Sequence, residues 1–298
     1  KKYPADLWYV NTIMMPEVVI AAHELGQPVL THVHELSAMY TQISRSDFET
    51  IIQDSTALLG CSEAVSKGLR EAGAKDVATL HSFVDLDAIR PDAGRVAAIR
   101  ASWGVGDGDF VWIMSGTSSE RKGFDLLPDL AAHYPAESPV HFVWVGKLLD
   151  DGLTYLTEQR CKQVKNVKIH LLGAQKSDYY ACLAAADGFM LTSRQEPFGM
   201  VLVEAAWLAK PIVSFDSGGP SEFIHPPVGE IVPALEIGFF VDAMRRIEQT
   251  HRTFDKEAAR QLALKYSVQA GVAQWIEHMD VFYERYDLAG DMYNRKNH

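Results

Sequence analysis

Hydrophobic and polar residues alternate along this chain in two different rhythms. Short runs rich in β-branched and aromatic residues, such as DLWYV and FVWIMSGT, are typical of buried strands. Longer segments between them, such as MPEVVIAAHEL and KSDYYACLAAA, carry apolar residues at helical spacing. This alternation indicates repeated strand–helix–strand units around parallel sheets buried on both faces, an α/β fold. Ten runs are strand-like: DLWYV, PVLTHVH, STALLGCS, VATLHSFV, FVWIMSGT, VHFVWVG, VKIHLLG, GFMLTS, PIVSFD and EIVPA.

The chain is predicted to form two domains, because 298 residues exceed what one core usually serves. Pro91 and Gly94 interrupt the alternation, and the next strand-like run begins only at Phe110. The C-terminal stretch has no strand signal and predicts one or two helices that pack back on the first domain. We therefore expect an N-terminal domain over residues 1–90, a second domain over residues 91–272 and a C-terminal helix over residues 273–298.

Composition and charge narrow the classes of partner. With 28 Lys and Arg against 39 Asp and Glu, the net charge of −11 repels nucleic acid, and no basic patch offsets it. No apolar run approaches the roughly 20 residues of a membrane span, and the N-terminal sequence lacks a signal-peptide pattern. The three cysteines, irregularly spaced, are typical of reduced thiols. We therefore expect a cytoplasmic protein, with peripheral contact to the inner membrane face left open.

Strand-to-helix turns are where chemistry is expected, because ligands of open parallel sheets bind beyond the carboxyl ends of the strands. In the turn TSRQEPFGM, Pro197 suits the first turn of a helix and Gly199 lets a ligand approach the backbone. The amides of Phe198, Gly199 and Met200 are then predicted to point at an anion that the helix dipole favours. The turn therefore predicts a phosphate site.

Two glutamates flank the start of this predicted helix. At about 1.5 Å per residue, Glu204 would lie roughly 12 Å from Glu196, about the span from a ribose to a sugar beyond a diphosphate. Each carboxylate can accept hydrogen bonds from two neighbouring hydroxyls. A helix with one N-terminal and one solvated glutamate would show the same spacing. The position of the pair between a strand and a glycine pair favours a nucleotide sugar instead.

The run from GFMLTS to GGPSE resembles the donor-binding signature of retaining glycosyltransferases of family 4, which have the GT-B fold of two Rossmann-like domains. It departs from that signature at Thr192, where the family usually has proline, and at Lys210, where glycine is common. The matching residues are Ser193, Glu196, Phe198, Gly199, Glu204, Ala205, Pro211, Gly218, Gly219 and Glu222.

The resemblance continues in the turn MSGTSSERKGFDLL, whose basic residues hold the donor diphosphate in the family. Lys122 matches the family lysine, whereas Thr117 replaces an arginine. Arg121 either compensates for that arginine or is a solvated surface charge. In GAQKSD, the backbone near Gly173 and Ala174 resembles the segment that holds the base. The resemblance thus assigns donor binding to Gly116, Thr117, Arg121, Lys122, Gly173, Ala174, Ser193, Glu196, Phe198, Gly199, Met200, Val201 and Glu204.

In the first domain, LTHVHEL resembles the strand and turn that bring a histidine to the active site, which matches His34. His32 lies two residues earlier and so on the same strand face. Ser62 is expected to cap a helix rather than to bind a ligand. The resemblance makes His34, Lys122 and Glu196 the catalytic residues.

The resemblance implies transfer of a sugar from a nucleoside diphosphate sugar to a hydroxyl of a glycan, a lipid-linked acceptor or a small molecule, with retention, as in polysaccharide biosynthesis. It implies no cofactor and no metal, since no Asp-x-Asp pair stands in a strand-to-helix turn. A non-hydrolysing nucleotide-sugar epimerase and a donor-binding module without turnover are the alternatives.

The first domain looks incomplete, because only four strand-like runs precede the boundary and the family's glycine-rich acceptor-side turn is missing. We expect either a fragment or strands supplied by another chain, with self-association through an unpaired sheet edge.

Overall fold

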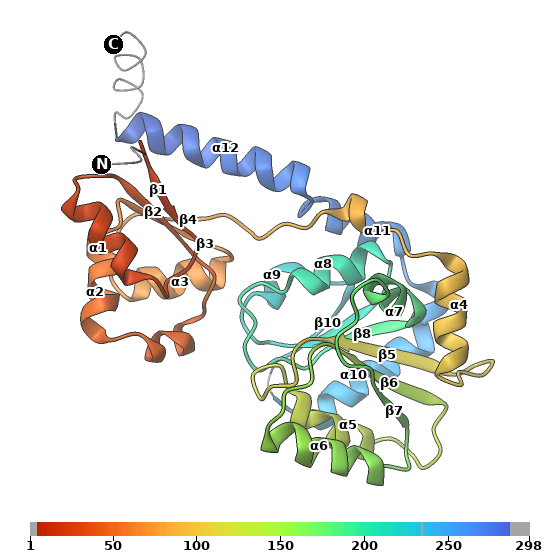
Figure 1. Cartoon of the computed structure of the whole chain (residues 1–298). Coiled ribbons are helices and arrows are strands. Elements are labelled where there is room, and N and C mark those ends of the chain that lie inside the picture. The colour runs from red at the N-terminus through yellow and green to blue at the C-terminus, as the bar shows by residue number, and fades with distance from the viewer. Residues whose placement is uncertain (1–4, 234, 287–298) are drawn as a thin grey trace. The chain divides into compact units, whose positions relative to one another are not determined.

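The structure is a computed structural model of the chain, and it describes residues 5–233 and 235–286. It divides into a first unit, Lys1–Phe83 with Tyr266–His298, and a second unit, Val84–Lys265. Each unit holds one parallel sheet with helices around it, which confirms the predicted α/β class (Figure 1). The sequence placed the divisions after residues 90 and 272, whereas the structure divides after residues 83 and 265. Residues 287–298 of the predicted C-terminal helix lie outside the described residues.

The first unit has a four-stranded sheet in the order β1-β2-β3-β4, with every neighbouring pair parallel. All four runs that precede the predicted boundary form these strands. The strands are β1 (Trp8–Val10), β2 (Val29–Val33), β3 (Ala57–Gly60) and β4 (Val77–Thr79). The connecting helices are α1 (Pro16–Glu24), η1 (Ser37–Gln42), α2 (Arg45–Asp54) and α3 (Glu63–Glu71).

Helix α12 (Val268–Arg285) covers one face of this sheet, while α1, α2 and α3 gather on the other (Figure 1). Arg285 donates to the carboxylate of Asp76 at 2.5 Å and fixes the end of the helix. At the other face, Ser62 accepts a hydrogen bond from the Val65 amide at 3.2 Å, so the predicted helix cap is confirmed. Buried apolar side chains of the sheet and of α12 form one cluster: Leu30, Leu59, Leu80, Met279 and Phe282.

The second unit has a six-stranded parallel sheet in the order β10-β9-β8-β5-β6-β7. The chain first builds outward from β5 through β6 to β7, then returns to β8 on the other side of β5 and builds outward again. The topological switch point therefore lies between β5 and β8. The strands are β5 (Phe110–Ser115), β6 (Val140–Val145), β7 (Lys168–Leu171), β8 (Gly188–Leu191), β9 (Ile212–Phe215) and β10 (Gly229–Val232).

Helices cover both faces of the second sheet, as continuous apolar strands such as Val140–Val145 require, since all six of its residues are buried. Helices α5, α6 and α10 lie together on one face, and α4, α7, α8 and α11 on the other (Figure 1). Their bounds are η2 (Leu86–Ala88), α4 (Ala93–Ser102), η3 (Phe124–Leu126), α5 (Leu127–Ala132), α6 (Gly152–Gln163), α7 (Tyr179–Ala185), α8 (Met200–Trp207), α9 (Pro220–Phe223), α10 (Ile237–Thr250), η4 (His251–Thr253) and α11 (Lys256–Leu264). None of the helices in the described part of the chain is long and apolar enough to span a membrane.

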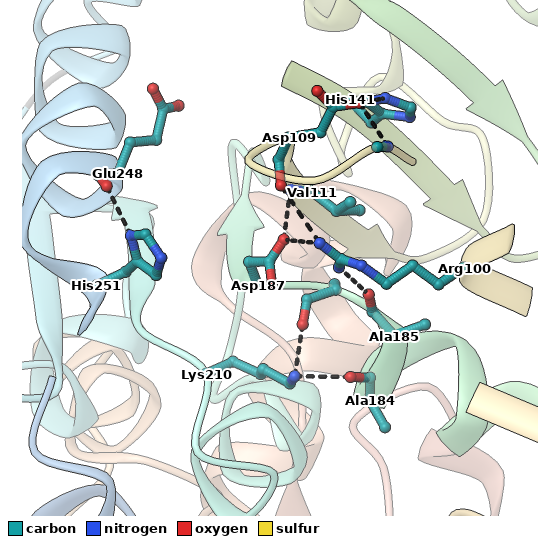
Figure 2. Close-up of polar contacts among 12 residues, drawn as sticks. Arg100, Asp109, Val111, His141, Ala184, Ala185, Asp187, Lys210, Glu248 and His251 are labelled. Carbon is teal, nitrogen blue, oxygen red and sulfur yellow. Dashed lines mark hydrogen bonds and ion pairs between the residues drawn. The ribbon is translucent and has the colours of Figure 1, made fainter. Parts of the chain in front are cut away.

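The amino ends of the central strands are held by charged groups (Figure 2). Arg100 donates to the Asp187 carboxylate at 2.9 Å and to the Ala185 carbonyl at 2.7 Å, and Asp187 accepts from the Val111 amide at 2.9 Å. These contacts join α4 to the strands β5 and β8. They lie at the edge of the sheet opposite to the carboxyl ends, where a ligand is expected.

Lys210, one of the two departures from the family signature, closes the end of α7 (Figure 2). Its ammonium donates to the carbonyls of Ala184 at 2.7 Å and Ala186 at 2.5 Å. The last carbonyls of a helix have no intrahelical partner, so a cation there satisfies them. Burial lowers the pKa of Lys210 to about 8. The lysine therefore has a structural role far from the candidate phosphate turn.

Candidate functional site

The candidate site lies at the carboxyl ends of β5 and β8, on either side of the switch point. The loop after Ser115 carries Lys122, and the loop after Leu191 carries Glu196. Parallel sheets of this order bind ligands in the crevice formed where strand order reverses. The two turns that the sequence singled out are thus brought side by side.

Lys122 and Glu196 form an ion pair between the lysine ammonium and Glu196 Oε2. The side chains are only 16% and 9% exposed, so both charges are largely withdrawn from water. Ser193 Oγ also donates to Glu196 Oε2, at 3.2 Å. Among the described residues, both side-chain contacts of Glu196 are made by Oε2 and none by Oε1.

Backbone contacts hold the two loops together. Gly123 has φ +72°, and a Cβ there would lie 2.1 Å from the carbonyl oxygen of Thr192, so only glycine fits this approach. The Arg194 amide donates to the Arg121 carbonyl at 2.8 Å, and the Arg194 guanidinium binds Asp125 with both nitrogens at 2.7 and 2.8 Å. The relative position of Lys122 and Glu196 is therefore set by the loops and not by their side chains alone.

Arg121 is exposed, and its guanidinium donates to the carbonyl of Gln195 at 3.1 Å. This contact fastens the lysine loop to the residue before Glu196. The two alternatives for Arg121, diphosphate contact and surface charge, both have to account for this bond.

The main chain of Glu196 is paired with the loop after β9. Its amide donates to the Ser217 carbonyl at 2.9 Å, and its carbonyl accepts from the Gly219 amide at 2.9 Å. A Cβ on Gly219 would lie 2.1 Å from the Pro197 carbonyl oxygen, so the glycine pair permits this close approach. The family's glycine pair thus shapes the backbone beneath Glu196.

The helix after Glu196 starts later than the sequence suggested. Helix α8 begins at Met200, and Gly199 caps it with φ +90°, so Pro197 does not occupy the first helical turn. The left-handed backbone at Gly199 delays the helix by about one turn of chain. The first-turn amides are those of Met200 and Val201, whose N–H groups have no intrahelical acceptor. Phe198, in contrast, buries its ring and is 2% exposed.

Glu204 lies on α8 with both carboxylate oxygens engaged. Tyr179 donates to Oε2 at 2.8 Å, and Tyr180 donates to Oε1 at 3.3 Å. Tyr179 also lies 3.0 Å from the hydroxyl of Ser115, the last residue of β5. Burial raises the pKa of the Glu204 carboxyl, and the two tyrosine hydroxyls oppose that shift.

The remaining predicted donor residues lie on neighbouring turns of the same edge. Gly116 follows β5, and its carbonyl accepts from the Trp144 indole at 2.8 Å. Gly173 follows β7, and its carbonyl accepts from the Gly146 amide at 3.0 Å. Thr117 and Ala174 are exposed beside them. These residues therefore lie at the carboxyl-end edge of the second sheet.

His34 belongs to the first unit, where it follows β2. Its Nε2 lies 2.9 Å from Asn11 Oδ1, and because an amide oxygen only accepts, Nε2 is the donor in this contact. Glu35 accepts from the His34 amide at 2.9 Å and from Thr12 Oγ1 at 2.6 Å, which joins the ends of β1 and β2. Burial lowers the pKa of His34, and the charge of Glu35 opposes it.

His32 lies on the same face as His34, with ring centroids 4.2 Å apart, as the strand period predicts. Its Nε2 faces the Leu80 carbonyl at 3.2 Å, and its Nδ1 faces the hydroxyl of Tyr9 at 2.8 Å. Burial, with the nearby His34, lowers the pKa of His32 to about 3. His32 is therefore a neutral core residue.

Several residues that hold these groups lie outside the positions predicted from the sequence. Tyr179 and Tyr180 had a signal, since two adjacent tyrosines open the small and apolar run YYACLAAA. Asn11 and Glu35 each follow a strand-like run, which is where such residues are expected. Ser217 and Gly146 had no signal beyond their positions after strands. Across the described residues, no group of three His, Cys, Asp or Glu side chains could hold a metal ion.

A family model described as glycosyl transferases group 1 matches residues 96–262, more than half of the chain. This chain belongs to that family. The matched range contains Lys122, Glu196 and Glu204.

Two individual relatives are similar to this chain over part of their length. The lipopolysaccharide core biosynthesis glycosyltransferase LpsE of Rhizobium meliloti is 32% identical over 164 residues, which cover 52% of this chain and 44% of the relative. A GDP-mannose-dependent alpha-(1-6)-phosphatidylinositol monomannoside mannosyltransferase of Mycolicibacterium smegmatis is 26% identical over 231 residues, 72% of this chain and 58% of the relative. The chain thus matches about half the length of these curated relatives.

Solved structures agree on the fold. Anabaena Alr3699/HepE, in complex with UDP and glucose, superposes with a TM-score of 0.82 at 22% identity over 93% of this chain and 78% of that chain. The sucrose-phosphate synthase of Thermosynechococcus elongatus superposes with a TM-score of 0.81 at 18% identity, over 95% of this chain and 75% of that chain. Two Rossmann-like domains of the GT-B type are therefore the fold of this family member.

Proposed function

We propose that this glycosyltransferase family member transfers a glycosyl group from a nucleoside diphosphate sugar to a hydroxyl acceptor, with retention of anomeric configuration. The observation that carries the proposal is the direct contact of Lys122 and Glu196 at the switch point of the second sheet. One loop supplies a cation for a diphosphate, and the other supplies a carboxylate for sugar hydroxyls.

The proposed roles follow from the chemistry of each group. Lys122 and the first-turn amides of Met200 and Val201 stabilise charge that develops on the leaving diphosphate. Glu196 Oε1 accepts hydrogen bonds from the sugar, and Glu204 accepts them from the ribose. The resemblance assigns His34 to the catalytic residues. The turnover of a His34→Ala variant tests that role separately from those of Lys122 and Glu196.

The proposed reaction needs no protein nucleophile. The acceptor oxygen forms a bond to the anomeric carbon, while the bond from that carbon to the phosphate oxygen breaks. The leaving phosphate oxygen takes the acceptor proton on the same face. The products are the glycosylated acceptor and the nucleoside diphosphate, and the transfer consumes no cofactor.

The donor is found first by thermal unfolding with UDP, GDP and ADP sugars. A ligand at about 100 times its dissociation constant stabilises the protein by about 2.7 kcal/mol. Transfer is then assayed with the donor that binds and with hydroxyl acceptors that include glycans and lipid-linked sugars. Release of free epimerised nucleotide sugar without an acceptor would favour the epimerase, and binding without transfer or hydrolysis would favour a binding module.

Lys122→Ala is expected to lower turnover by on the order of a hundredfold, as loss of one preorganised donor to a developing anion does. Lys122→Arg is expected to recover part of the rate, because a planar fork does not reproduce a point charge. The measurement is kcat with saturating donor for wild type and both variants. Full activity of Lys122→Ala would refute the assignment and direct attention to Arg121.

A further inference from the structure

The two tyrosines on α7 hold the Glu204 carboxylate unequally. The Tyr179 hydroxyl lies 2.8 Å from Oε2, which is the usual length for a hydrogen bond between oxygens. The Tyr180 hydroxyl lies 3.3 Å from Oε1, well beyond that length. One oxygen of Glu204 is therefore firmly bound and the other weakly bound.

The firm contact is part of a directional chain. A phenol has one proton, and Tyr179 donates it to Glu204, so its oxygen accepts from the hydroxyl of Ser115, 3.0 Å away. Ser115 ends β5 and immediately precedes Gly116. The chain thus ties the carboxylate on α8 to the strand that leads into the diphosphate turn. Burial and the charge of Glu204 raise the pKa of Tyr179 and keep it protonated.

The weak contact has no such support. Tyr180 has no second hydrogen bond among the described side-chain contacts, and its hydroxyl reaches Glu204 from a half-buried position. A neutral hydroxyl that meets a carboxylate at 3.3 Å is easily replaced by another hydroxyl that meets it at the usual distance. Glu204 Oε1 is consequently the oxygen that can accept a hydrogen bond from a ligand.

We propose that Tyr179 is a positioning residue that fixes the Glu204 carboxylate, and that the Tyr180 hydroxyl holds the place taken by a ribose hydroxyl when a nucleotide binds. The inference rests on the proposed function, which assigns the ribose to Glu204. Recognition of the ribose then depends on a pair of adjacent residues with opposite roles. If the two tyrosines only joined α7 to α8, removing the hydroxyl of Tyr179 and removing that of Tyr180 would change ribose recognition to the same extent.

The experiment compares Tyr179→Phe with Tyr180→Phe, which remove one hydroxyl each and keep the ring. Calorimetry measures the dissociation constants of UDP, GDP and ADP and of their 2′-deoxy counterparts, and the pair that binds wild type most tightly is used. The readout is the ratio of deoxy to ribo dissociation constants, because general damage to the fold would not change a ratio. Glu204→Gln serves as the reference that removes the charge.

For wild type we expect a ratio of about tenfold or more, as loss of a hydrogen bond to a charged group predicts. Tyr179→Phe is expected to reduce the ratio to below about threefold, and Glu204→Gln to abolish it. Tyr180→Phe is expected to keep the full ratio and to bind the ribonucleotide as well as wild type or up to about threefold better.

Equal loss of the ratio in both tyrosine variants would overturn the inference, as would a wild-type ratio near one with a nucleotide that binds. In both cases the nucleoside diphosphate still binds, so the donor site stands. Failure of all six nucleotides to bind wild type would instead overturn the proposed function, and this inference with it.

Discussion

Ser217 carries a hydroxyl that is buried without a hydrogen-bond partner, and among the described residues no other buried side-chain polar atom is in that condition. Its carbonyl accepts from the Glu196 amide, so the residue lies directly beneath the site. A buried hydroxyl that has lost water and gained no partner reduces stability. Polar groups left in this condition tend to occur where function has priority over stability.

We therefore expect Ser217→Ala to raise the free energy of unfolding by up to about 1 kcal/mol, because it removes an unsatisfied group without loss of a bond. Urea unfolding of the unliganded protein measures this. Ser118→Ala is the matched control, since Ser118 is also buried but accepts from the Leu149 amide at 2.7 Å and pairs with Thr154 at 2.8 Å. Ser118→Ala should lower the free energy of unfolding by about 1–2 kcal/mol. A comparable loss in Ser217→Ala would show that its hydroxyl has a partner in solution.

At the residue scale the sequence singled out residues but not their contacts. Lys122 and Glu196 were each assigned to a ligand, but nothing in the sequence indicated that residues 74 positions apart would pair with each other. Such pairing depends on loop geometry, here on the close approach of Gly123 to Thr192. The contacts of Tyr179 and Tyr180 with Glu204 were not predicted. Two adjacent tyrosines at the start of an apolar run indicate that their hydroxyls need partners, but not which residues those partners are.

At the scale of elements, all ten strand-like runs form strands, because β-branched and aromatic runs of this length have few other stable states. Helix starts were less predictable. Proline favours the first helical turn in general, yet the left-handed Gly199 shifts the start of α8 to Met200. A backbone conformation at one glycine decided a boundary that residue preferences alone placed elsewhere.

The cap of α6 gives a test at this scale. Asp151 accepts a hydrogen bond from the Thr154 amide at 2.8 Å, while the exposed Asp150 beside it makes no described contact. Asp151→Ala is expected to lower the free energy of unfolding by about 1 kcal/mol, and Asp150→Ala by less than about 0.5 kcal/mol. Chemical denaturation of both variants distinguishes them. Equal effects would mean that charge near the helix start matters and the hydrogen bond does not.

Lys210 predicts how the contact between α7 and the start of β9 depends on pH. Its pKa is about 8 in the folded protein against an ordinary value of 10.5, so the charged form is disfavoured by folding. Between these values the unfolded chain binds more protons, and stability from this group rises with pH, by at most about 1.4 kcal/mol per unit. The penalty is fully present below pH 8 and disappears above pH 10.5.

The measurement is the free energy of unfolding of wild type and Lys210→Met from about pH 7 to pH 10.5. The difference between wild type and variant is expected to shift in favour of wild type as pH rises through this range. The subtraction removes the contribution of other groups that titrate there. Parallel curves would show that Lys210 has an ordinary pKa and is more hydrated than its two carbonyl contacts suggest.

At the scale of the whole molecule, the second unit is one continuous stretch, Val84–Lys265, whereas the first unit needs two separate stretches. All predicted donor-binding residues lie in the second unit, which has its own six-stranded sheet and buried aromatic core around Trp112 and Trp144. Residues 84–265 expressed alone are therefore expected to fold and to bind the nucleoside diphosphate within about threefold of the full chain. Calorimetry on both proteins tests this, and a loss beyond about tenfold would show that the first unit contributes to nucleotide binding.

The division into units also shows what the sequence pattern could not specify. The pattern predicted two domains and a C-terminal helix on the first of them. It placed the divisions seven residues late in both cases, after residues 90 and 272 instead of 83 and 265. The pattern marks where helices and strands change, whereas the divisions follow from which side chains share a core. For example, Met279 and Phe282 share a core cluster with Leu59, which is far from them in the sequence.

The Lys122–Glu196 ion pair supplies each of these two buried charges with a counterion. Under the proposed function, a diphosphate that draws the ammonium away leaves the Glu196 carboxylate, only 9% exposed, with the Ser193 hydroxyl as its remaining partner, and a buried charge that loses its counterion is strongly unfavourable. A ligand must therefore exchange two partners at once, an anion for the lysine and a hydroxyl donor for the glutamate. Inorganic pyrophosphate offers only the first and a free sugar only the second, so under the proposed function the site favours a molecule in which both are covalently joined.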